Sequence, residues 1–237
     1  LKPGQFLHDA DVSEPLTSFT RRVCSMSVYS LFFDYATVIS KDNKDLATVC
    51  DQHPTLNRHR DIRCIDHTRV IVPHPSEPHD YINANYVDGF REEKKFILTQ
   101  SPLEETVQSF WAMIYQEKVV EIVALTPLHP KKSFLYIPTK RTMPVTFGPF
   151  TIQFCGSQII RDAYEASILK LKKEKEKERK ILHICFFSWQ NMGTPTKPTE
   201  LIYLATDINF NRKLFMEEAE RSGWLQGAQY CLHLFHS

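Results

Sequence analysis

The chain has 237 residues, of which 42% are hydrophobic and 24% are charged, and its formal net charge is +1. These proportions are ordinary for a globular protein, and the length suits one large domain. The nearly balanced charge gives no whole-molecule argument for binding nucleic acid, so we expect no nucleic-acid partner. No apolar run approaches the length of about 18 residues that a membrane-spanning helix needs, so we expect no membrane segment within this chain.

The cysteines are scattered along the chain, and no CxxC pair occurs among them. They are Cys24, Cys50, Cys64, Cys155, Cys185 and Cys231. In a chain of this length, such cysteines are typical of reduced core residues in an intracellular domain. The first residue is not Met, so we expect the chain to be a piece of a longer protein.

Two helical regions are predicted in the first half of the chain. Residues 16–39 have the pattern of one or two helices. The clearest helix should start at Ser101, a suitable N-cap that is followed by Pro102 and by Glu104 at the capping-box position. Its apolar residues fall on one face at helical spacing: Leu103, Val107, Phe110, Trp111 and Ile114.

Four strand-like runs accompany these helices. Residues 94–100 and 118–127 flank the helix after Ser101, which predicts a parallel pair of strands with a right-handed crossover. Residues 163–171 and 181–187 are separated by a run of mixed charges, KLKKEKEKERK. We expect these two to form an antiparallel pair joined by a solvated, charged tip.

The last predicted helix follows Pro198 and ends at Gly223. In its first half Leu201, Leu204, Ala205 and Ile208 share one face. Together the elements predict an α/β fold, namely a mixed, twisted sheet with helices on both faces.

Five stretches, in order along the chain, resemble the protein tyrosine phosphatase domain, the cysteine-dependent, non-metal kind found in receptor and cytosolic enzymes. They are NRHRDIRCIDHTRV at 57–70, DYINANYVDGF at 80–90, FILTQSPLEETVQSFWAMI at 96–114, YIP at 136–138, and HICFFSWQNMGTPTKPTEL at 183–201. The resemblance covers about residues 19–201. It implies a single phosphatase-like domain over residues 1–237, in which residues 202–237 diverge.

The resemblance implies that phosphate-ester hydrolysis needs a low-pKa Cys in a Cys-x5-Arg loop, whose amides and Arg hold the phosphate. No Cys-x5-Arg occurs in this chain, and the nearest counterpart is QYCLHLFHS, where Cys231 has Ser237 six residues on. No glycine follows Cys231 there, so we expect no anion-binding loop. Cys231, His233 and His236 are adjacent candidates without a distant partner, so neither a metal nor a cofactor is expected.

The family's mobile acid loop reads Trp-Pro-Asp-x-Gly-x-Pro, and its counterpart here is WQNMGTP. Trp189, Gly193 and Pro195 keep the frame of that loop, whereas Asn191 stands at the position of the acid. An amide can donate a hydrogen bond but cannot transfer a proton, so the loop would lack its general acid. Asn191 also suits a turn with left-handed backbone, which is compatible with this interpretation.

The family's phosphotyrosine-recognition loop has its counterpart at Asn57, Arg58 and His59. The resemblance implies that His59 takes the place of a Tyr that stacks on the phosphotyrosine ring, over a smaller area. It also implies that Asp61 accepts hydrogen bonds from a peptide backbone. The alternative is that Asn57, Arg58 and Asp61 only hold the loop together.

In the family, several helices follow the Cys loop, so we expect the domain's C-terminus to be missing here. The sequence therefore predicts a degenerate, catalytically inactive pseudophosphatase that acts in phosphotyrosine-related binding or regulation. Its expected partners are phosphotyrosine-containing or other signalling proteins, and its expected location is the cytoplasm or the cytoplasmic part of a membrane receptor. Two alternatives stay open: a weakly active or truncated tyrosine phosphatase, and a purely structural interaction module.

Overall fold

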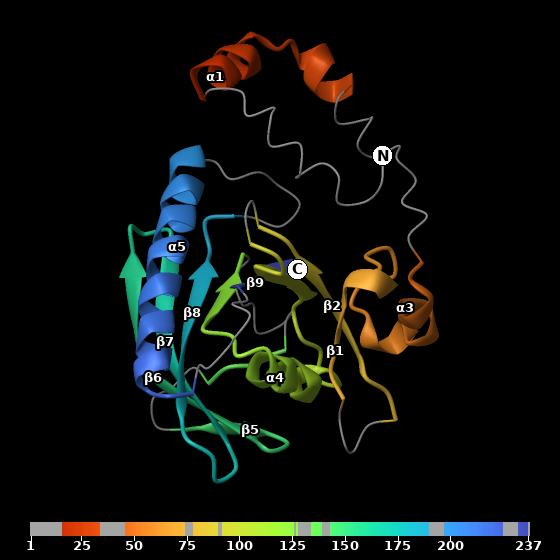
Figure 1. Cartoon of the computed structure of the whole chain (residues 1–237), viewed down its shortest axis with the longest axis vertical. Helices are drawn as coiled ribbons and strands as arrows, with labels where there is room; N and C mark the ends of the chain where they lie inside the picture. Colours follow the sequence, from red (N-terminus) through yellow and green to blue (C-terminus); the bar gives the residue numbers. More distant parts are fainter. Residues whose placement is uncertain are drawn as a thin grey trace. The chain divides into compact units, whose positions relative to one another are not determined.

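The computed structural model describes most of the chain, and residues 232–236 by their backbone alone. The described residues are 16–33, 46–73, 78–89, 92–125, 127, 134–138, 143–189, 197–224 and 232–236. The chain divides into two compact units, Leu1–Asp45 and Leu46–Ser237. The first unit contains helix α1 (Leu16–Ser25), and residues 28–33 are also helical, which confirms the helices expected near the start (Figure 1). A single domain over the whole chain stays a prediction.

The second unit is built on one mixed sheet, whose strand order is β1-β2-β3-β9-β4-β8-β7-β6-β5 (Figure 1). The strands are β1 (Arg69–Ile71), β2 (Tyr81–Val87), β3 (Phe96–Gln100), β4 (Glu121–Ala124), β5 (Val145–Phe147), β6 (Phe150–Ile160), β7 (Tyr164–Lys173), β8 (Arg179–Phe186) and β9 (Leu232–His236). The neighbours β3, β9, β4 and β8 run parallel. The strands outside them pair antiparallel.

The predicted parallel pair of β3 and β4 is wrong in one respect, because β9 lies between them. The strands β3 and β4 do run in the same direction, but Leu234 of β9 pairs with Leu98 on one side and with Val123 on the other. The strand that is last in the sequence therefore fills the centre of the sheet.

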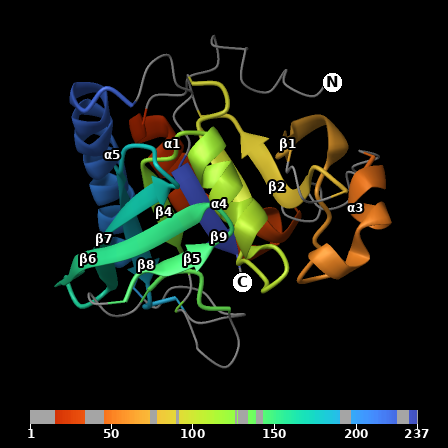
Figure 2. The ribbon, with the colours of Figure 1, turned by 90° about the horizontal axis from the view of Figure 1, so that it is seen from below.

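Helices cover both faces of this sheet (Figure 2), as the sequence predicted. Helix α4 (Val107–Gln116) packs on one face and α5 (Pro198–Arg221) on the other. Within β4, Ile122 belongs to the core under α4, whereas Val123 belongs to the core under α5. This alternation follows from the two-residue period of a strand, and it makes β4 apolar on both sides. The described short helices are α3 (Thr48–Gln52) and the 3-10 turns η3 (Pro54–Leu56) and η4 (Asp66–Thr68).

The start of α4 differs from its prediction. The helix begins at Val107 with Thr106 at its N-cap position, rather than at Ser101. The backbone N–H of Leu103 donates to Thr106 Oγ1 at 2.9 Å. The hydroxyl of Ser101 is buried and has no hydrogen-bond partner within the described part of the chain, so it does not cap the helix. The predicted capping box with Glu104 is therefore wrong, although the apolar face from Val107 onward is confirmed.

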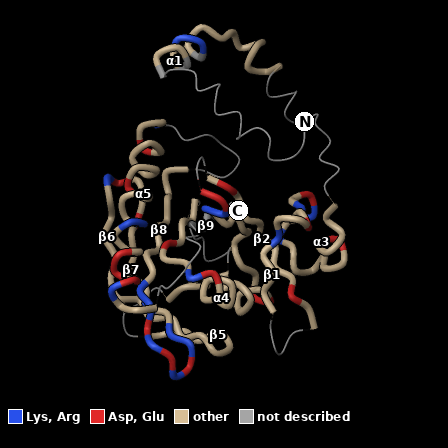
Figure 3. The backbone as a smooth tube through the Cα atoms, in the orientation of Figure 1, with Lys and Arg blue, Asp and Glu red and all other residues tan. Residues whose placement is uncertain are grey.

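The two other long predictions agree with the structure. Helix α5 is continuous over 24 residues, and Gly223 follows it with φ +74, although Ala205 is exposed. Strands β7 and β8 form the expected antiparallel pair, in which Lys170 faces Lys180. Blue and red segments alternate around the connection between these strands in Figure 3, as expected for a solvated charged tip.

Trp111 offers a test of this core, because its side chain is 0% exposed and its indole N–H donates to the carbonyl of Tyr136 at 3.1 Å. We expect Trp111→Ala to lower the free energy of unfolding in urea by about 3–5 kcal/mol, because a large buried ring is lost. The matched control is Ile202→Ala on α5, where the side chain is 63% exposed. The control should change the free energy by no more than about 0.5 kcal/mol, and equal effects would contradict the burial of Trp111.

Candidate functional site

The predicted recognition residues lie in one loop, residues 57–63, which connects η3 to the segment before η4. We call this segment the recognition loop. It lies beside β2 and the last residue of β3, to which its side chains and backbone are bonded. Its residues do not share one role, because some side chains point into the protein and others into solvent.

Asn57 anchors the start of the loop. Its Nδ2 donates to the carbonyls of Cys50 at 3.2 Å and His53 at 2.9 Å. Its Oδ1 accepts from the hydroxyl of Tyr81 at 2.6 Å and from Nδ2 of Asn83 at 2.9 Å. Both ends of the amide are therefore used inside the protein, so this partly buried Asn has a structural role.

Arg58 fastens the loop to the end of β3. Its backbone N–H donates to Oε1 of Gln100 at 2.8 Å, and Nε2 of Gln100 donates to the carbonyl of Leu56 at 2.8 Å. The guanidinium of Arg58 donates to the carbonyls of Ser101 at 3.2 Å and Pro102 at 3.0 Å. Burial lowers the pKa of Arg58, yet an Arg stays charged in proteins. These contacts hold the recognition loop against the end of β3, although Arg58 and Gln100 are 42 residues apart in the sequence.

His59 and Asp61 are different, because both side chains are exposed to solvent. Arg60, which lies between them, is exposed as well. The structure thus brings the four predicted recognition residues into one loop but separates them into two inward anchors and two outward side chains. The outward pair can reach a ligand without disturbing the anchors.

The recognition loop lies at the carboxyl end of the parallel strands. Gln100, to which the loop is bonded, is the last residue of β3 and pairs with His236, the last residue of β9. In open α/β sheets, ligands bind outside the carboxyl ends of the strands. Trp189 follows the carboxyl end of β8 and packs, partly buried, against the core under α5 with Leu204. Both the loop and Trp189 therefore lie at the end of the sheet where a ligand is expected.

Four of the predicted positions, Asn191, Gly193, Pro195 and Cys231, lie outside the described residues. Strand β9 begins at the residue after Cys231. Among the described residues, no group of three or more His, Cys, Asp and Glu side chains is placed to hold a metal ion. None of the helices in the described ranges is long and apolar enough to cross a membrane.

Three buried polar side chains, Tyr136, His183 and Glu121, were given no role from the sequence. Tyr136, in the YIP stretch, shares a hydrogen bond of 2.6 Å with Nε2 of His183, and burial lowers the pKa of His183 to about 4, so this imidazole is neutral. Glu121 is fully buried in β4, and burial raises its pKa to about 9. The signal for Glu121 was available, because VVEIVA is an apolar run with one acidic residue.

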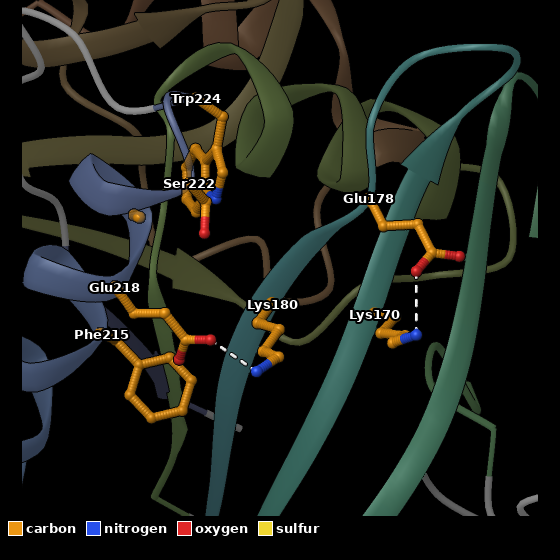
Figure 4. Close-up of a pocket in the computed structure, with 8 residues that line it drawn as sticks. Lys170, Glu178, Lys180, Phe215, Glu218, Ser222 and Trp224 are labelled. Carbon is orange, nitrogen blue, oxygen red and sulfur yellow. Dashed lines mark hydrogen bonds and ion pairs between the residues drawn. The ribbon is translucent and has the colours of Figure 1, made fainter.

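A pocket of about 210 Å³ lies between the C-terminal end of α5 and strands β7 and β8 (Figure 4). Its charged side chains pair with one another, as Lys170 does with Glu178 at 2.9 Å and Lys180 with Glu218. The pocket lies near the start of β8, which is the opposite end of that strand from Trp189. It therefore shares no residue with the recognition loop, and the charges of Lys170 and Lys180 are already compensated by Glu178 and Glu218.

The anchoring role of Asn57 can be tested on stability. We expect Asn57→Ala to lower the free energy of unfolding by about 1–3 kcal/mol or more, because it leaves the buried partners Tyr81 and Asn83 without their acceptor. The control is His59→Ala in the same loop, which should change it by no more than about 0.5 kcal/mol, because His59 is exposed. Urea unfolding measures both, and a loss at His59 as large as at Asn57 would contradict the division of the loop.

The chain is similar to known proteins both in sequence and in fold. The family model described as protein-tyrosine phosphatase matches residues 53–223. The tyrosine-protein phosphatase non-receptor type 9 of Homo sapiens is 33% identical over 152 residues, which are 62% of this chain and 26% of that relative. The probable tyrosine phosphatase protein N1 of Microplitis demolitor bracovirus (isolate Webb) is 36% identical over 158 residues, which are 64% of this chain and 49% of that relative.

These coverages mean that the chain spans about a quarter of the first relative and about half of the second. A solved structure described as "Structural basis of PTPN18 fingerprint on distinct HER2 tyrosine phosphorylation sites" has the same fold, with a TM-score of 0.69 and 24% identity. That likeness covers 92% of this chain and 76% of the other. Because the family model matches well over half of the 237 residues, the chain belongs to the protein-tyrosine phosphatase family.

Proposed function

We propose that this chain is a pseudophosphatase, a member of the family that does not hydrolyse phosphotyrosine and acts in phosphotyrosine-related binding or regulation. The observation that carries this proposal is the replacement of the residues that the chemistry needs. Asn191 stands at the position of the general acid, inside the region that the family model matches. An amide has no proton to transfer to a leaving phenolate near neutral pH.

The position of the nucleophile supports the same proposal. In the family, an apolar strand leads directly into a His-Cys pair, and here β9 ends at His236. From this order we propose that Ser237, which follows His236, is the counterpart of the nucleophile, in place of Cys231, which the sequence suggested and which precedes the strand. A serine hydroxyl is a weak nucleophile unless a neighbouring base activates it, whereas a thiolate is strongly nucleophilic by itself.

The recognition loop supports a retained binding role. Asn57 and Arg58 hold the loop at the carboxyl end of β3, and His59 and Asp61 are exposed there. We propose that His59 stacks on an aromatic side chain of a partner and that Asp61 accepts hydrogen bonds from the partner's backbone. The solved structure of the same fold is described as concerning HER2 tyrosine phosphorylation sites, which is compatible with a phosphotyrosine-containing partner for this chain.

We further propose an intracellular location, in the cytoplasm or in the cytoplasmic part of a membrane receptor. The cysteines among the described residues are free thiols: Cys24, Cys50, Cys64, Cys155 and Cys185. Free thiols at several depths of the protein are compatible with a reducing compartment.

Hydrolysis is the first test. We expect purified protein to turn over a phosphotyrosine peptide and an aryl phosphate no faster than Ser237→Ala does, because under this proposal Ser237 and Asn191 stand in place of the nucleophilic Cys and the general acid. If the wild-type protein instead turned over either substrate much faster than Ser237→Ala does, that result would favour the weakly active phosphatase over the pseudophosphatase.

Binding is the second test, and isothermal titration calorimetry with phosphotyrosine peptides measures it. We expect saturable binding that His59→Ala weakens about 2- to 10-fold, because an aromatic contact contributes about 0.5–1.5 kcal/mol. The control is Lys175→Ala on the charged tip, which should leave the affinity unchanged. No binding at millimolar peptide would contradict the binding role and favour the purely structural module.

A further inference from the structure

The strongest unexplained feature of the described residues is a buried acid in the centre of the sheet. Glu121 in β4 is 0% exposed, and neither of its carboxyl oxygens has a hydrogen-bond partner among the described residues. A buried, ionised carboxylate without hydrogen bonds is very costly, so such a group stays protonated. A buried polar group of this kind calls for a physical explanation.

The cation whose charge acts on this acid comes from α5. Strand alternation places Glu121 on the same side of β4 as Val123, which is the side covered by α5. Arg212 of α5 is itself buried, and its charge is the opposing influence on the pKa of Glu121. From other strands, Leu182 of β8 is the apolar register partner of Glu121, and Tyr164 of β7 is a titratable group whose pKa responds to Glu121.

Arg212 is already bound to another acid, Glu92, in the turn before β3. Its Nη1 and Nη2 both donate to the carboxylate of Glu92, and the ammonium of Lys95 lies 3.6 Å from the same carboxylate. Desolvation opposes the ionisation of Glu92, but the hydrogen bond and charge of Arg212, together with Lys95, hold its pKa below the ordinary value. Arg212 therefore pairs with the ionised carboxylate of Glu92, while its charge also acts on the neutral carboxyl group of Glu121.

Glu92 and Glu121 lie next to the two strands between which β9 pairs, Glu92 shortly before β3 and Glu121 in β4. Leu232, the first residue of β9, pairs with Phe96 of β3 and with Glu121 of β4. Glu92 precedes β3 by a few residues, and Glu121 is the first residue of β4. Arg212 thus connects α5 to elements on either side of the amino end of the central strand.

We propose that Glu92, Arg212 and Glu121 form a proton-linked latch that holds α5 against the amino ends of the central strands. In the closed state Arg212 pairs with Glu92, and Glu121 keeps its proton. When Glu121 releases this proton to solvent, two carboxylates compete for one guanidinium, and α5 loosens from the sheet. This device does not depend on whether the chain binds or hydrolyses phosphotyrosine.

The latch predicts that the stability of the folded protein falls as the pH rises. Burial raises the pKa of Glu121 from 4.5 to about 9, so the folded protein keeps a proton that the unfolded chain releases. The stability that this proton contributes is fully present below pH 4.5 and is lost as the pH rises through 9. Over that window the folding equilibrium constant should fall by up to about tenfold for each pH unit.

The titration of Glu121 itself distinguishes the latch from an isolated buried acid. We expect the carboxyl ¹³C signal that disappears in Glu121→Gln to titrate near pH 9 in the wild-type protein. In Glu92→Gln the midpoint should fall by about one pH unit or more, because the charge of Arg212 is then free to stabilise the ionised form of Glu121. The matched control is Glu93→Gln, the exposed neighbour, which should leave the midpoint unchanged. A midpoint that Glu92→Gln does not move, or a wild-type midpoint near 4.5, would overturn the proposal.

Unfolding in urea between pH 6 and 9 gives an independent readout. We expect the folding equilibrium constant to decline with rising pH more steeply in the wild-type protein than in Glu121→Gln, because Gln needs no proton to be buried. The two slopes should differ by up to about tenfold per pH unit. Glu121→Gln keeps the shape of the side chain and should fold. Hydrogen exchange of the α5 amides should increase at pH 9 in the wild-type protein but not in this variant, after correction for intrinsic exchange. Parallel pH dependence of the two proteins would contradict the latch.

Discussion

The backbone pairing of β9 is the constraint on which the rest of the sheet depends. Its N–H and C=O groups bond on one side to β3 and on the other to β4, so that it joins the β1-β2-β3 half to the five remaining strands. Buried backbone groups need hydrogen-bond partners, and without β9 the facing edges of β3 and β4 would lose theirs. The cores under α4 and α5 both include residues of β4, so this one pairing also supports both faces.

Local patterns were sufficient for the elements whose contacts are local or strongly periodic. The β7–β8 pair was predicted from two strand-like runs and a charged tip, and α5 from an apolar face and the stop at Gly223, and the structure agrees. The β9 insertion was not predictable in this way, because its place is decided by strands more than 100 residues earlier in the chain. The predicted start of α4 was wrong for a related reason. Ser101 has the properties of an N-cap, but it directly follows β3, and its carbonyl accepts a hydrogen bond from Arg58.

For the candidate site, too, the sequence indicated some features and not others. The sequence indicated which residues belong to the recognition loop, but only the geometry separates Asn57 and Arg58, which point inward, from His59 and Asp61, which are exposed. Glu121 was missed although one acidic residue in an apolar run is visible in the sequence, because its burial follows only once both faces of the strand are covered. Once α4 and α5 cover β4, any charge in that strand must be protonated or paired.

The residues that match the family divide by what they do for the fold. Asn57 and Arg58 are used in internal hydrogen bonds, as is Tyr136, and Arg69 pairs with Asp80. Losing any of them would cost stability in a protein of this fold whether or not it hydrolyses a substrate. Their presence is therefore no evidence for activity. Under the proposed function, the substitution at Asn191 concerns the chemistry instead. A chain that keeps the residues needed for folding and changes those needed for hydrolysis is what the proposed binding role would lead us to expect.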